Sequence, residues 1–82
     1  MRIEDATQVL AKCALFDNRL AGEGEILAWA EAIPDWVEVQ DALTAVSAWY
    51  RASTRRIMPA NLIAEAKRAR AHRTGRPLYE GD

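Results

Sequence analysis

Four apolar residues recur at alternating intervals of four and three in the middle of the chain: Val39, Leu43, Val46 and Tyr50. This spacing returns to one side of an α-helix, whereas a half-buried strand would need an apolar residue at every second position. Residues 37–53 are therefore predicted to form an amphipathic helix at the centre of the fold. Leu43, Val46 and the neighbouring Trp49 are expected to be buried.

The same spacing predicts three more helices, at residues 3–16, 23–33 and 59–72. Pro34 should end the second helix, because the residue before a proline avoids the helical region. Pro59 suits the first position of the last helix, and Gly75 suits its C-terminal stop. No strand pattern is present. The prediction is an all-α, compact four-helix domain over residues 1–75, followed by a flexible C-terminal tail at residues 76–82.

Two short segments carry local signals for a turn and a cap. Asp17-Asn18-Arg19 should form a turn, because Asn and Asp tolerate the left-handed conformation. Asp35 is the expected N-cap of the helix at 37–53, with Glu38 three positions later as the second member of a capping box.

Length and composition restrict the class of protein. A chain of 82 residues, half of them apolar, is enough for one domain with one core. No run approaches the roughly 20 apolar residues of a membrane span, and the polar N-terminus lacks a secretory signal. Cys13 is the single cysteine, so no internal disulfide can form. We therefore expect a cytoplasmic protein without a membrane partner.

The residues that could support catalysis are few. Cys13 lies on the apolar stripe of the first helix, which predicts a small buried hydrophobe. His72 is the only histidine, and one Cys with one His falls short of a structural zinc site. No glycine-rich phosphate loop is present. The chain is predicted to be no enzyme and to bind no metal or cofactor.

Charge is distributed unevenly along the chain. Residues 1–50 hold three basic and nine acidic side chains, and residues 51–82 hold eight basic and three acidic ones. Such asymmetry is typical of a surface for nucleic acid or an acidic partner. The alternative is that the two halves attract each other within the fold.

The basic residues of the last helix are the main candidates for a partner-binding site: Lys67, Arg68, Arg70 and Arg73. Arg73 follows the apolar part of its row and is expected to project freely. Trp36, beside the Pro34-Asp35 turn, is a second candidate, because Trp and Arg are enriched in interface hot spots. A solvated helix end, stabilised by the helix dipole, is the alternative interpretation.

Arg55 and Arg56 precede this helix, and their distance from its basic end is left open by the sequence. No aromatic residue interleaves the basic cluster in the sequence, which weakens the prediction of a platform for stacking single-stranded bases.

Three segments resemble the helicase loader/inhibitor proteins of phages: Ile26–Ile33, Asp41–Tyr50 and Ile57–Ile63. They are similar to that family's Trp-containing second helix, its central helix and its proline-started last helix. Ile3-Glu4-Asp5-Ala6 and Asp17-Asn18-Arg19 also look like small proteins of actinobacteria and their phages.

The resemblance implies a small, non-catalytic accessory protein of phage DNA replication that binds the hexameric replicative helicase. Two alternatives stay open. One is a DNA-binding protein that uses the basic fourth helix, with a weak nucleic-acid contact there. The other is a regulatory protein-interaction module unrelated to replication, because a shared fold does not determine function.

Overall fold

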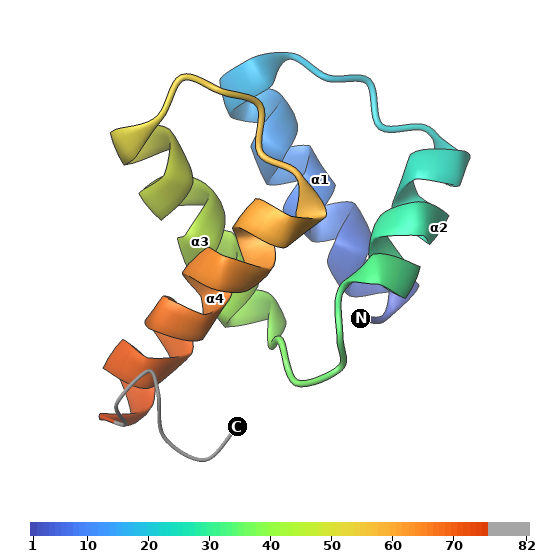
Figure 1. Ribbon diagram of the computed structural model, residues 1–82. Coiled ribbons are helices and arrows are strands. Elements are labelled where there is room, and N and C mark those ends of the chain that lie inside the picture. Colours follow the sequence, from blue (N-terminus) through green and yellow to red (C-terminus); the bar gives the residue numbers. More distant parts are fainter. Residues whose placement is uncertain (76–82) are drawn as a thin grey trace.

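The computed structural model describes residues 1–75 and contains four α-helices and no strand in that range (Figure 1): α1 Ile3–Asp17, α2 Glu23–Ala32, α3 Val39–Ala52 and α4 Pro59–Thr74. The predicted all-α four-helix fold is confirmed. The tail predicted at residues 76–82 lies outside the described residues. None of the four helices has the length and apolar character needed to cross a membrane.

Helix α3 occupies the centre of the arrangement. It packs against α1 on one side and α4 on the other, and α2 packs against α1 (Figure 1). Ala42 and Ala45 are fully buried on α3, and such small side chains allow a close approach of neighbouring helices. The central position predicted from its apolar stripe is therefore correct.

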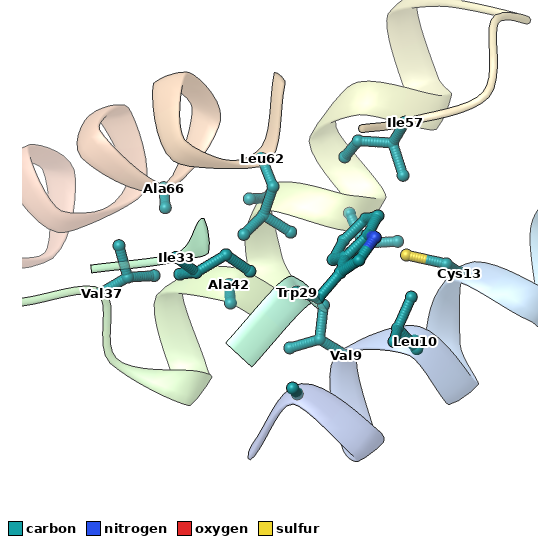
Figure 2. Packing of buried hydrophobic residues seen from close by; sticks show 13 residues of the cluster. Val9, Leu10, Cys13, Trp29, Ile33, Val37, Ala42, Ile57, Leu62 and Ala66 are labelled. Carbon is teal, nitrogen blue, oxygen red and sulfur yellow. The ribbon is translucent and has the colours of Figure 1, made fainter. Parts of the chain in front are cut away.

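The core is a single cluster of buried apolar side chains from all four helices and the connections between them. Figure 2 shows the Trp29 ring lying among Leu10, Cys13 and Ile57. Val46 is fully buried as predicted, but Leu43 and Trp49 are only half-buried. The Trp49 indole N–H donates to the carbonyl of residue 55 at 2.7 Å, which keeps the polar edge of the ring at the surface.

The predicted capping box at the start of α3 is wrong. The helix begins at Val39, with Glu38 in the N-cap position and no capping hydrogen bond from a side chain. A turn closed by the Val37 N–H on the Pro34 carbonyl separates Asp35 from the helix. Asp35 pairs instead with the N-terminal ammonium group at 3.1 Å.

The predicted bounds of α1, α2 and α4 lie within two residues of those in the structure. Asn18 follows α1 in the left-handed conformation, with φ of 58°, and Gly75 follows α4 with φ of 73°. Pro59 is the first residue of α4. These signals are local, so they were readable from the sequence without knowledge of the packing.

Candidate functional site

Two of the predicted partner-binding residues meet on one surface. Trp36 lies in the α2–α3 turn with 38% of its surface exposed. The Arg70 guanidinium carbon lies 5.4 Å from the centroid of the Trp36 ring, a cation–π arrangement between α4 and that turn. Lys67 is one helical turn before Arg70 and therefore neighbours it on α4. We call Trp36, Lys67 and Arg70 the Trp36 surface.

Arg68 leaves α4 in a different direction. It is two residues from the buried Ala66, a rotation of about 200°, whereas Arg70 is rotated by only about 40°. Arg68 is exposed and pairs with Glu65 at 3.3 Å. Arg68, Lys67 and Arg70 all lie outside the buried core as predicted, but Arg68 does not share a face with Arg70.

The prediction that Arg73 projects freely is wrong. Its guanidinium donates to both carboxylate oxygens of Asp41, at 2.9 and 2.8 Å, and to Glu38 at 3.2 Å. Asp41 is only 2% exposed and requires a partner, because a buried unpaired carboxylate is costly. Arg73 follows Leu62, Ala66 and Ala69 in one row and thus reaches the start of α3 beyond the core. The hydrogen bond with Asp41 is the main cause of a raised Arg73 pKa.

Carboxylate groups pair with two of the arginines in the second half of α4. Glu38 and Asp41 neutralise Arg73, and Glu65 neutralises Arg68. The Arg73 pairs also join the acidic first part of the chain to the basic second part, as the alternative interpretation of the charge asymmetry predicted. The positive potential near the Trp36 surface is therefore lower than the sequence suggested.

Arg55 and Arg56 do not belong to this surface. They precede α4, whose 16 residues span about 24 Å. Arg70 lies in the last part of the same helix, so the two groups of arginines are at opposite ends of α4. The question left open by the sequence is thus decided by the helix length.

A second polar constellation surrounds the buried Arg19, in the linker between α1 and α2. Its guanidinium donates to Asp17 at 2.6 Å, to the Ile57 carbonyl at 2.8 Å and to Glu25 at 3.4 Å. It also stacks over the Trp29 ring at 5.2 Å. One side chain therefore holds together the end of α1, the start of α2 and the loop before α4.

Tyr50 extends this network to α3. Its hydroxyl donates to Asp17 and accepts a hydrogen bond from the Ile57 N–H at 3.0 Å. The hydrogen bonds from Arg19 are the main cause that lowers the Asp17 pKa to about 2. Within residues 1–75, no buried side-chain nitrogen or oxygen lacks a hydrogen-bond partner. The network therefore stabilises the fold, and none of its buried polar side-chain atoms is left without a hydrogen bond for a ligand to supply.

The sequence analysis placed Arg19 in a turn but missed its burial. Arginine is almost never buried unless it is paired. The available signal was the proximity of Asp17, Arg19 and Glu25 in a short linker, but the decisive partners, Tyr50 and the Ile57 carbonyl, are distant in the sequence.

The two residues considered for catalysis, Cys13 and His72, lie in different environments. Cys13 is fully buried, and burial raises the pKa of its thiol to about 11, which leaves it protonated and poorly nucleophilic at neutral pH. His72 is exposed in the last turn of α4. Among residues 1–75, no group of three or more His, Cys, Asp or Glu side chains is arranged to hold a metal ion.

Comparison with known proteins identifies no family for this chain. No protein-family model matches the chain, and neither a curated protein nor a solved structure is significantly similar to it. The candidate surfaces are therefore judged on their geometry and charge.

Proposed function

We propose that this protein is a non-catalytic, protein-binding module of phage-type DNA replication, which docks on the replicative helicase in the cytoplasm. The observation that carries the proposal is the contact between Trp36 and Arg70. Tryptophan and arginine are the side chains that most often dominate interface energy. Here they are joined on a half-exposed surface that two separate elements build.

The geometry of the Trp36 surface favours a protein partner over duplex DNA. The Arg70 guanidinium is already oriented by the indole ring, so little side-chain entropy is lost on binding. Glu38, Asp41 and Glu65 surround the basic half of α4 and would lie close to the phosphates of a duplex. A protein interface tolerates such a mixture of charges, because complementary groups can face each sign.

The helicase is named as the partner on the resemblance of Ile26–Ile33, Asp41–Tyr50 and Ile57–Ile63 to the loader/inhibitor proteins. In this proposal the protein occupies a surface of the helicase and does not itself hydrolyse nucleotide. Regulation then depends on occupancy, so binding and release are the quantities to measure.

A binding titration against a purified hexameric replicative helicase tests the proposal. Trp36→Ala and Arg70→Ala should each weaken the affinity by about 2 kcal/mol, roughly 30-fold, as hot-spot residues do. Arg68→Ala is the matched control, because it removes an exposed arginine from another face of the same helix, and its affinity should change less than about threefold.

The outcomes separate the partner from the surface. If the parent protein does not bind the helicase, the assignment of the partner is wrong. If it binds and both variants equal the control, the interface lies elsewhere and the Trp36 surface must be abandoned. Circular dichroism of each variant establishes that it is folded.

A further inference from the structure

The C-terminal ends of α1 and α3 meet the two linking loops at the end of the molecule drawn at the top of Figure 1. Phe16 of α1 stacks on Tyr50 of α3. The Tyr50 hydroxyl accepts the Ile57 N–H in the loop before α4, and Arg19 of the first linker donates to the Ile57 carbonyl. Segments that are distant in the sequence therefore form one continuous surface.

This surface contains a stacked pair of aromatic rings, Phe16 and Tyr50. The rings of Phe16 and Tyr50 are nearly parallel, with an interplanar angle of 11° and centroids 4.9 Å apart. The Tyr50 hydroxyl forms hydrogen bonds with Asp17 and Ile57, so the Tyr50 ring cannot move freely. Phe16 nevertheless keeps 51% of its surface exposed. One side of the Phe16 ring is thus supported and much of the remainder is open to a ligand.

Three exposed arginines are near neighbours in the chain of Tyr50 or of Ile57, which the Tyr50 hydroxyl contacts: Arg51, Arg55 and Arg56. In the part of the chain that the structure describes, no residue forms an ion pair or hydrogen bond with their guanidinium groups. The backbone that carries them is anchored, because the Arg55 N–H donates to Ser53 at 3.1 Å and its carbonyl accepts from Trp49 at 2.7 Å. The loop therefore presents unpaired guanidinium groups from a fixed backbone.

The net charge at this end is positive. No Asp or Glu occurs between Asp41 and Glu65 in the sequence. The nearby Arg19 pairs with both Asp17 and Glu25, so this network keeps one net negative charge against the three positive charges of the exposed arginines. Residues Tyr50 to Arg55 line an open recess of about 470 Å³. The basic half of α4 differs from this surface, because carboxylates there pair with Arg68 and Arg73.

We infer that this end binds single-stranded nucleic acid, with an unstacked base on the Phe16 ring and the backbone phosphates on the arginines. We call it the Phe16 platform, defined by six residues: Phe16, Leu20, Arg51, Arg55, Arg56 and Met58. Aromatic rings with adjacent arginines bind single strands without base-specific hydrogen bonds, because every base has a π-face. Leu20 and Met58 are exposed next to these elements and offer apolar contact to sugars and bases.

The loop arginines should contact phosphate more strongly than the helix end itself. The last carbonyl groups of α3 carry partial negative charge and repel phosphate, and Arg51 in the last turn offsets that charge. Arg55 and Arg56 extend from the loop beyond the helix and are less affected. Three arginines neutralise few phosphates, so the contact is weak at physiological salt. It strengthens when another interaction raises the local strand concentration.

Fluorescence anisotropy with a labelled oligothymidylate of about twelve nucleotides tests this inference without any helicase. For three neutralised phosphates, the log–log salt slope should be about −2, so the affinity should fall roughly 16-fold between about 50 and 200 mM salt. Phe16→Leu, which keeps an apolar side chain but removes the ring, should weaken binding at least about fivefold.

Charge-matched double variants provide the control. Arg55→Gln with Arg56→Gln should reduce the slope to about −0.7, because one phosphate contact remains. Arg2→Gln with Arg68→Gln removes the same charge from two exposed arginines elsewhere and should leave the slope unchanged. A duplex of the same length should bind more weakly, because its bases are already stacked.

Two results would overturn the inference. One is the absence of binding by the parent protein at about 50 mM salt, which is also the result expected if this end serves a protein partner. The other is equal binding by the two double variants. Neither result depends on whether the Trp36 surface binds a helicase, so the two proposals stand or fail separately.

Discussion

At the scale of single residues, the most consequential side chain is Arg19. A buried guanidinium is costly unless its hydrogen bonds are satisfied, and here carboxylates, a carbonyl and an aromatic ring all contact it. Asp17 receives hydrogen bonds from both Arg19 and Tyr50. The network therefore connects the stability of the fold to the ionisation of one carboxylate.

The first stability prediction concerns acid. The Asp17 pKa is lowered in the folded protein from 3.8 to about 2. The unfolded chain therefore takes up a proton at higher pH than the folded one. The resulting stability, about 2 kcal/mol, is fully present above about pH 4 and is lost as the pH falls towards 2.

Asp17→Asn should remove this part of the acid sensitivity and lower stability at neutral pH. Chemical denaturation at several pH values from neutral to about 2 measures both effects. Glu4→Gln is the control for an exposed carboxylate, because solvent screens the backbone hydrogen bond and the Arg2 pair that lower the Glu4 pKa. If the parent and Asp17→Asn lose stability in parallel over the acid range, Asp17 is not the linked group.

At the scale of the helices, α2 and α4 show how one residue type has opposite effects at different positions. Gly24 lies within the first turn of α2, and a Cβ atom placed there would meet no other atom within 4 Å. Gly75 also has open space around it, but its φ of 73° is strained for other residues. Backbone conformation, not space, distinguishes the two glycines.

The second stability prediction uses this pair. Gly24→Ala should stabilise the protein by about 0.5–1 kcal/mol, because alanine loses less backbone entropy on forming a helix. Gly75→Ala should destabilise the end of α4 by about 1 kcal/mol, because the left-handed conformation is unfavourable with a Cβ atom. Thermal melts followed by circular dichroism would show opposite shifts in Tm. A fall in Tm for Gly24→Ala would contradict the conclusion that position 24 is helical and has room for a Cβ atom.

In the whole molecule, ion pairs among residues 1–75 connect the acidic first part of the chain to the basic second part at one end only. Arg73 joins α4 to the buried Asp41 at the start of α3. At the opposite end, the arginines of the Phe16 platform have no such partners among residues 1–75. The two ends thus differ, because the arginine at one end is paired with carboxylates and those at the other end are not.

The third stability prediction tests the role of Arg73 in this arrangement. Arg73→Gln leaves the buried Asp41 carboxylate without its main partner and should destabilise the protein. Adding Asp41→Asn should recover part of the loss, because the buried charge is then absent. A double-mutant cycle by urea denaturation measures the coupling. Additive effects of the two substitutions would show that Arg73 does not stabilise the fold through Asp41, and would reopen its interpretation as a free interface residue.

The number and type of the helices were predictable from the sequence, because apolar periodicity, prolines and a terminal glycine act through local backbone geometry. The sequence also identified Trp36 and Arg70 as interface candidates from their residue types. Only the packing of the helices brings Trp36 to Arg70, buries Arg19, pairs Arg73 with Asp41 and stacks Phe16 on Tyr50. Each of these joins residues far apart in the chain, and their proximity depends on how α3 packs between α1 and α4. Periodicity specifies which face of a helix is buried, but not which residues of another helix that face will meet.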